Sequence, residues 1–396
     1  MWSVVCFNLG IRSLYVVSRA VGLAPISVNF ENFSVEKGDQ LISLWSVLLF
    51  IPLLIVYPIS WYPVSSMPHV ASLTSEHPDE SSITGMGNIS WTVQYTTGYV
   101  VLFMISIMQI GRRREDTVEF LRGIVTLYHK LQSILPNTSS NYQQQRRPPI
   151  QTALCKNLVA LFLFKSILFE MILLIATWFN LNSHFENTLT LSAFLHSFVT
   201  LFPSLLLAIL SNGFYGASLL LAFYLMSLNG KLLRIGEKLS SATMLSQSAH
   251  GDDGKGHRHA LHPHHHQLHF SDEIDEIAIL YEKVLNYVQK LHMYSTFSVL
   301  LIITQSFMNI IVELFLIYLA LATEYTNTNY SHIAIELSFV ILHYLQIFFV
   351  VQASVMIQKQ FSILKFICCK ICLKTSFWCS EINCNTYLNF YNSILD

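Results

Sequence analysis

Residues 293–322 read MYSTFSVLLIITQSFMNIIVELFLIYLALA, an apolar run whose only charged side chain is Glu313. A helix of about 20 apolar residues crosses the roughly 30 Å of hydrocarbon in a bilayer, so this run is long enough to span a membrane. Runs of the same character lie at 42–62, 91–110, 157–179, 191–227 and 332–357. The sequence therefore predicts an all-α fold, a polytopic transmembrane helical bundle with six spans.

The composition agrees with a membrane protein. Hydrophobic residues make up 53% of the 396-residue chain and charged residues 12%, whereas charged residues make up about a quarter of a typical soluble domain. A formal net charge of -1 gives no reason to expect a nucleic-acid partner. The sequence contains no phosphate-binding glycine loop, nucleophile elbow or His-Glu-x-x-His motif, so we expect neither an enzyme nor a bound cofactor.

Basic residues are distributed unevenly among the loops between these runs. Three loops contain no Lys or Arg, namely 63–90, 180–190 and 323–331. The loops 111–156 and 228–292 contain most of the basic residues of the chain. Because basic loops remain in the cytoplasm, the chain is predicted to be a multi-pass plasma-membrane protein with an intracellular N-terminus. Asn88 and Asn329 are then glycosylation candidates, since their Asn-x-Ser sequons fall in loops predicted to be extracellular.

The chain is expected to divide into three regions: a cytoplasmic N-terminal segment with a short amphipathic helix at 1–41, the transmembrane bundle at 42–357, and an atypical C-terminal tail at 358–396. A His-rich cytoplasmic linker, residues 240–271, lies within the second region. Neutral imidazoles can bind zinc or copper, but these histidines have no fixed spacing and no cysteine nearby. We therefore expect a solvated linker and no metal site.

Two stretches predict helices that continue beyond the membrane. In the run 191–227, Ser211-Asn212-Gly213 could form a turn between two spans, but the remaining residues 214–227 are short for a second crossing. One long helix, bent at Pro203, is the better interpretation. Residues 272–291 have apolar side chains three and four apart, the pattern of an amphipathic helix, and should continue into the span at 293–322.

Ionisable side chains inside a span cost at least about 2.5 kcal/mol each at its centre unless they are paired or hydrated. The predicted spans contain Lys165, Glu170, His196, Glu313, Glu336 and His343. Lys165 lies in the inner half of its span and is expected to extend to the cytoplasmic surface. Glu313 is the strongest indication of a cavity, because an acid at that depth needs water, a partner or a ligand. A purely structural partner remains an equal alternative.

An outer-half cavity would meet a ligand that arrives from outside, and aromatic rings would supply much of its contact area. The ligand-binding candidates at this level are Tyr95, Tyr99, Trp178, His196, Glu313, Tyr318 and Glu336. Trp178 and Tyr318 have an alternative role as anchors at the membrane interface. Tyr95 and Tyr99 lie one helical turn apart, and packing in the core explains them equally well.

Three stretches of the chain carry a family resemblance. Residues 13–25 read SLYVVSRAVGLAP, residues 223–232 read FYLMSLNGKL, and residues 280–318 join an amphipathic helix to an apolar span. In these stretches the chain resembles the insect gustatory receptors. This resemblance implies a ligand-gated cation channel with seven spans, an inside N-terminus and a central pore in a homo- or hetero-tetramer with related receptor subunits. The implied partners are a small-molecule tastant, monovalent and divalent cations, and membrane lipid.

The chain departs from that family near residue 386. Gustatory receptors carry Thr-Tyr, five apolar residues and Gln-Phe in a pore-lining seventh span, whereas here Thr386-Tyr387 is followed by Asn389 and no Gln-Phe. Residues 358–396 contain no 20-residue apolar run, so the sequence predicts no seventh span. A truncated, non-conducting receptor variant and a membrane transporter are therefore alternatives. A G-protein-coupled receptor is disfavoured, because its first inter-span loop would be cytoplasmic.

Overall fold

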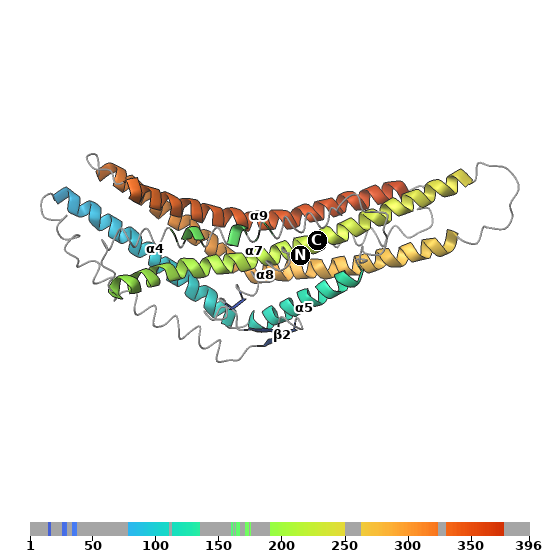
Figure 1. Cartoon of the computed structure of the whole chain (residues 1–396), viewed down its shortest axis with the longest axis horizontal. Helices are drawn as coiled ribbons and strands as arrows, with labels where there is room; N and C mark the ends of the chain where they lie inside the picture. The colour runs from blue at the N-terminus through green and yellow to red at the C-terminus, as the bar shows by residue number, and fades with distance from the viewer. Residues whose placement is uncertain are drawn as a thin grey trace. The chain divides into compact units, whose positions relative to one another are not determined.

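The computed structural model describes residues 15–16, 26–29, 34–37, 78–110, 113–134, 191–249, 263–323 and 330–375, with isolated positions between 160 and 175. Most of these residues belong to long helices, which are α4 (Pro78–Ile110), α5 (Arg113–Ile134), α7 (Leu191–Ala249), α8 (Pro263–Thr323) and α9 (Tyr330–Thr375) (Figure 1). The predicted helical architecture is confirmed for these long helices.

Helix α7 runs without a break from Leu191 to Ala249. It contains Pro203 and continues through Ser211-Asn212-Gly213, so the prediction of one long helix in place of two spans is confirmed. At 1.5 Å per residue, its 59 residues reach about 88 Å, far more than the roughly 30 Å of hydrocarbon. A large part of α7 therefore lies outside the hydrocarbon layer.

Helices α8 and α9 are also longer than a span requires. Helix α8 joins the amphipathic stretch 272–291 to the apolar run 293–322 in one element, as predicted. Helix α9 continues past residue 357 to Thr375, so the first part of the predicted C-terminal tail is helical.

In the described part of the chain, three helices are long and apolar enough to cross a membrane: Phe202–Ser241, Asp272–Leu321 and Ile333–Cys369. Thr92–Ile105 is a shorter apolar helix. These helices and the composition identify a helical membrane protein. The predicted span 42–62 lies outside the described residues, and 157–179 is described only in part. The count of six spans and the side of the N-terminus therefore stay predictions.

A short hairpin is the one described element that is not helical. Strand β1 (Ile26–Asn29) pairs antiparallel with β2 (Ser34–Lys37), with Ile26 opposite Lys37 and Asn29 opposite Ser34. The sequence analysis predicted only helix, so the all-α prediction requires this correction. Four-residue strands carry no long apolar alternation, and the hairpin is therefore easy to miss.

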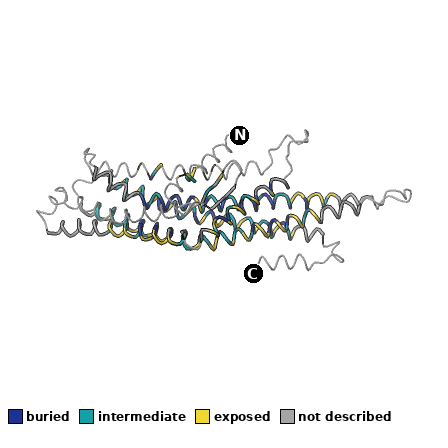
Figure 2. The backbone as a smooth tube through the Cα atoms, turned by 90° about the horizontal axis from the view of Figure 1, so that it is seen from below, coloured by how far each residue is buried: buried dark blue, intermediate teal, exposed yellow. Residues whose placement is uncertain are grey.

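The chain forms two compact units. The first comprises Met1–Thr126, Thr152–Leu219 and Tyr287–Ser354, and the second comprises Leu127–Gln151, Leu220–Asn286 and Val355–Asp396. Helices α7, α8 and α9 therefore each contribute residues to both units. Buried and exposed residues alternate along the same helices in Figure 2, as expected for helices that have one inward face.

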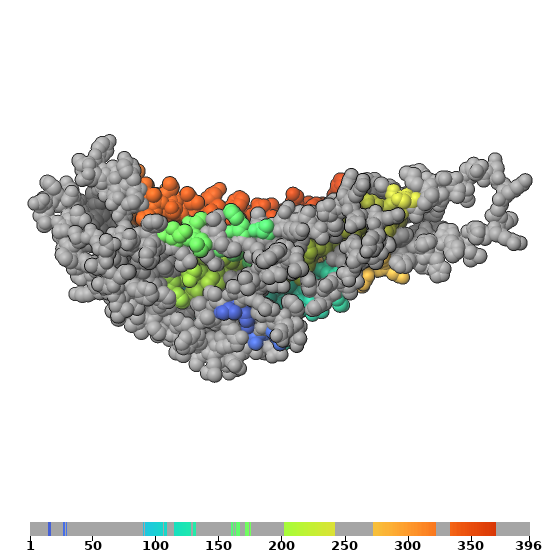
Figure 3. Space-filling view, viewed as in Figure 1, coloured from blue at the N-terminus to red at the C-terminus, as the bar shows by residue number. Residues whose placement is uncertain are grey.

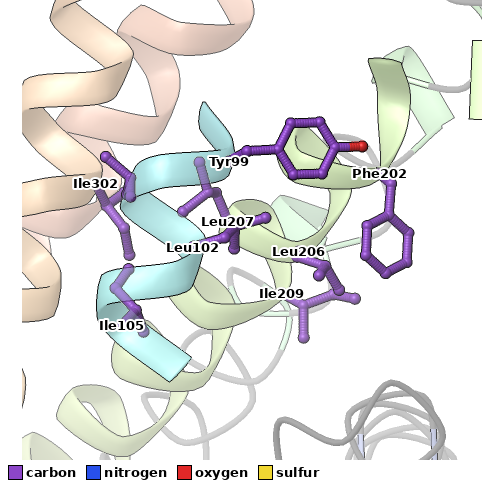
Figure 4. Close-up of a cluster of buried hydrophobic side chains, with 9 residues drawn as sticks. Tyr99, Leu102, Ile105, Phe202, Leu206, Leu207, Ile209 and Ile302 are labelled. Atoms are coloured by element: carbon purple, nitrogen blue, oxygen red, sulfur yellow. The ribbon is translucent and has the colours of Figure 1, made fainter. Parts of the chain in front are cut away.

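The first unit has its main apolar core where α4, α7 and α8 meet. Its buried members are Tyr99, Val101, Leu102, Ile105, Phe202, Leu206, Leu207, Ile209 and Ile302 (Figure 4). The close approach of α4 to α7 depends on Gly98, because a Cβ there would lie 3.3 Å from Cβ of Pro203. At the start of the chain, Tyr15 packs against Val118 of α5.

Helix α7 is the most enclosed of the three long apolar helices. Its apolar window is 61% buried, against 33% for α8 and 28% for α9. Large apolar side chains remain exposed on the outer two, among them Leu300, Phe307 and Ile311 on α8 and Tyr344, Phe348 and Val351 on α9. In the space-filling view of Figure 3, α9 accordingly shows its side chains along the visible surface. Lipid is the solvent that such apolar surfaces require.

Two glycines of α7 allow a matched test of this packing. We expect Gly213→Ala to raise the free energy of unfolding by about 0.5–1 kcal/mol, because alanine favours helix and a Cβ at Gly213 meets nothing within 4 Å. Gly216→Ala should lose this gain and become destabilising, because its Cβ would lie 2.9 Å from Cε2 of Phe162. Thermal unfolding of the two purified variants in the same detergent measures the difference. Equal midpoints would contradict the predicted contact.

Candidate functional site

The buried face of α8 carries three polar side chains inside an apolar span. Gln305, Asn309 and Glu313 are four residues apart, which places them on one face of the helix. Each is only 3–4% exposed. Polar groups are expensive to bury in such surroundings unless they are hydrogen-bonded. The partners of these three residues therefore identify the candidate site.

Hydrogen bonds connect α8 to α4 through Gln94. The Nε2 atom of Gln94 donates to Oε1 of Glu313 at 2.7 Å. The Nε2 atom of Gln305 donates to the backbone oxygen of Gln94 at 3.2 Å and to Oδ1 of Asn309 at 2.8 Å. Gln94 of α4 thus contacts two turns of α8, one through its side chain and one through its backbone.

Helix α9 completes the site through His343. Its Nε2 lies 3.1 Å from Nδ2 of Asn309. A backbone oxygen can only accept, so Gln305 must present its amide nitrogen, and Asn309 must then present its oxygen to Gln305 and its nitrogen to His343. Nε2 of His343 is therefore an acceptor, and the proton of the neutral imidazole sits on Nδ1. We call Gln94, Gln305, Asn309, Glu313 and His343 the polar network.

Two buried atoms of the polar network make no hydrogen bond of normal geometry to a described residue. Among the described residues, Oε2 of Glu313 and Nδ1 of His343 are buried without a hydrogen-bond partner. The first is an acceptor, and the second is a donor by the assignment above. Glu336 is half-buried on α9, two helical turns before His343, and its carboxyl group interacts with that of Glu313. Two acidic groups therefore meet at the Glu313 end of the network.

The structure separates the other predicted ligand-binding residues. Tyr95 is half-buried on α4 next to Gln94, whereas Tyr99 is 2% exposed within the apolar core of Figure 4, where packing accounts for it. Tyr318 is 65% exposed and is not brought to the polar network. The side chains of Trp178 and His196 lie outside the described residues.

The structure describes the backbone of one of the two glycosylation candidates. Asn329 lies outside the described residues, and Asn88 falls within α4, whose side chain there is not described. Helix α4 begins at Pro78, well before the predicted span start at residue 91. Any sugar on Asn88 would therefore be attached to a helix and not to a loop.

A second buried polar cluster surrounds Lys165. Its Nζ atom donates to Oδ1 of Asn212 at 2.5 Å and to Oγ of Ser211 at 3.3 Å. It also lies 5.0 Å from the ring centroid of Tyr215 and 5.8 Å from that of Phe349. Lys165 is 1% exposed, so the prediction that it extends to the cytoplasmic surface is wrong. Neutral oxygens and aromatic faces bind this cation inside the first unit.

Most members of both clusters were not predicted from the sequence. The predicted residues were charged or aromatic, whereas the clusters also contain the neutral amides of Gln94, Gln305, Asn309 and Asn212. The sequence signal for these amides was the spacing of four residues between Gln305, Asn309 and Glu313. The apolar side chains Leu300, Phe307, Ile311 and Leu314 lie on the exposed part of the same helix. An amide stripe opposite an apolar stripe indicates an inward polar face.

A scan against protein families finds one that fits nearly the whole sequence. The family model described as 7tm chemosensory receptor matches residues 11–383. The match extends past residue 357 and into the predicted tail. No curated protein matches the chain.

Proposed function

The chain belongs to the family of 7tm chemosensory receptors, and from this premise we propose that it is a gustatory receptor, a ligand-gated cation channel subunit of the plasma membrane. The proposal places a small-molecule tastant at the polar network and cations in a pore formed with related receptor subunits. Family membership supports the receptor role, and the apolar helices support a membrane location.

Glu313 is the observation that carries the proposed ligand site. Its side chain is 4% exposed, one carboxyl oxygen is bonded to Gln94, and the other makes no hydrogen bond of normal geometry to a described residue, although the Glu336 carboxyl group interacts with Glu313. A core built only for stability is expected to satisfy both oxygens. An acceptor left open between α4, α8 and α9 is what a binding site for a hydrogen-bonding molecule requires.

In the proposed orientation, this site lies toward the outside of the cell. With the N-terminus in the cytoplasm, the span at 293–322 runs outward and Glu313 lies in its outer half. A ligand in contact with helices α4, α8 and α9 can shift the equilibrium between a closed and an open arrangement if it binds the open one more tightly. In the proposed tetramer, the pore forms where the subunits meet.

Glu313→Gln tests this function with little change in side-chain shape. Hydrogen bonds to charged groups contribute about 1.5–3 kcal/mol, so we expect the half-maximal concentration of an activating tastant to rise by about 10- to 100-fold. The measurement is the tastant-evoked current in cells that also express a related receptor subunit, with surface expression matched.

The matched control is Glu119→Gln. Glu119 is an exposed acid on α5 that pairs with Lys290 at 2.8 Å, and exposed ion pairs contribute little. Its dose–response curve should follow that of the unmodified receptor. Identical curves for Glu313→Gln and Glu119→Gln at equal surface expression would exclude Glu313 from the ligand site.

A further inference from the structure

The two acidic side chains at the end of the polar network identify a class of ligand. We propose that the group recognised at Glu313 and Glu336 is the ammonium of a protonated organic amine, an inference that rests on the proposed function of the same site. The charge of the site, its hydrogen-bonding atoms, its poor fit to a metal ion and the cost of burial all favour this ligand class.

The charge of the site favours a cation. The carboxyl groups of Glu313 and Glu336 interact with one another, and Glu313 is almost completely buried. Like charges repel strongly where water is excluded, so two neighbouring carboxyl groups need a proton or a positive charge between them. The described residues of the polar network offer amides and an imidazole and contain no ammonium or guanidinium group. A cationic ligand would take the place of a proton held between the two carboxyl groups.

The open atoms of the site favour a hydrogen-bond donor. Oε1 of Glu313 already accepts from Gln94. Oε2 is buried and makes no hydrogen bond of normal geometry to a described residue. A primary ammonium carries three N–H donors and can bond to Oε2 and to the Glu336 carboxyl group together. Charge-assisted bonds of this kind are about twice as strong as neutral ones.

A metal ion fits the site less well than an amine. No group of three His, Cys, Asp or Glu side chains in the described ranges is arranged to hold a metal. Calcium takes six to eight oxygen ligands, and magnesium requires a nearly octahedral set. Two carboxyl groups beside amide groups that are already bonded to one another provide too few ligands for either ion.

Burial determines which amine should bind best. Because Glu313 is 4% exposed, an entering cation must lose much of its water and replace those hydrogen bonds within the site. A primary ammonium can do so through its N–H groups. A quaternary ammonium has the same charge and no N–H donor, so it should bind more weakly. The alcohol of the same chain length has a donor and no charge.

The test measures thermal stabilisation of the purified full-length chain in lipid nanodiscs. The probes are butylammonium, tetramethylammonium and 1-butanol, with the ionic strength matched by sodium chloride. A ligand that binds only the folded state raises the unfolding midpoint as its concentration increases. We expect butylammonium to give a saturable rise and a half-saturating concentration at least tenfold lower than that of either other probe.

Variants show whether any stabilisation arises at this site. Glu313→Gln and Glu336→Gln should each raise the half-saturating concentration of butylammonium at least tenfold, whereas Glu119→Gln should leave it unchanged. Equal stabilisation by 1-butanol and butylammonium, no stabilisation by butylammonium, or no effect of either site variant would overturn the inference.

The amine inference and the proposed function can fail separately. If neutral tastants evoke currents that depend on Glu313 while butylammonium does not bind, the receptor function stands and the amine class is wrong. If butylammonium binds at Glu313 and no current is evoked by any tastant beside a related subunit, the ligand class stands and the channel function fails.

Discussion

Asn212→Leu should lower the free energy of unfolding by about 3 kcal/mol, since a buried donor that loses its acceptor bears its desolvation cost, which is larger for a charged group. Oδ1 of Asn212 accepts from Nζ of Lys165 at 2.5 Å, and both side chains are at most 1% exposed. Leucine retains the branching of asparagine at Cγ and is larger, so no cavity forms and the acceptor is lost. Chemical unfolding in detergent, followed by circular dichroism, measures the change.

Two further variants give this prediction its controls. Ser211→Ala removes the longer contact, at 3.3 Å, and should cost less than Asn212→Leu. Adding Lys165→Met to Asn212→Leu also removes the buried ammonium and should recover most of the loss, because buried ion sites are often replaced by apolar side chains without penalty. A double variant as unstable as Asn212→Leu alone would show that the ammonium does not depend on Asn212.

Asn229→Leu should cost about 2–4 kcal/mol in the second unit, because each buried polar partner left unsatisfied costs about 1–3 kcal/mol. Nδ2 of Asn229 donates to the backbone oxygen of Gln360 at 3.0 Å and to its Oε1 at 3.3 Å. Oδ1 of Asn229 accepts from the hydroxyl of Tyr281 at 3.0 Å. One amide thus bonds α7 to both α8 and α9. The thermal unfolding midpoint of the purified protein reports the loss.

Tyr281→Phe is the matched variant for this amide. It removes only the hydroxyl and retains the ring, which lies edge-on to Phe361 with centroids 6.4 Å apart. The expected cost is about 1 kcal/mol, the net contribution of one hydrogen bond. If Tyr281→Phe proved as harmful as Asn229→Leu, the bonds of Asn229 to Gln360 would have no measurable role.

Local patterns in the sequence were sufficient to predict the long helices. The continuous α7 followed from the shortness of residues 214–227, because the thickness of a bilayer sets a minimum length for a second crossing. The joining of 272–291 to 293–322 in α8 followed from apolar spacing of three and four. Glu313 was identified for the same kind of reason, since the cost of an acid in an apolar run depends on the run alone.

Contacts between distant residues could not be read in this way. Lys165 was compared with Glu170 on its own helix, whereas its described partner Asn212 lies 47 residues away. Gln94 and Glu313 are 219 residues apart, and neither the spacing nor the composition of one helix says which neighbour faces it. Tyr318 and Tyr99 lie in similar apolar runs, and only packing makes one exposed and the other buried.

The bonds of Asn229 also set an order of events during synthesis. Gln360 follows Asn229 by 131 residues, so at about 5–20 residues per second the ribosome needs on the order of ten seconds to supply it. During this interval the Asn229 amide and the Tyr281 hydroxyl can meet, but the partner from α9 does not yet exist. The second unit must therefore complete its packing late in translation. A nascent chain stalled before residue 360 would expose the unbonded amide of Asn229 to cellular quality control.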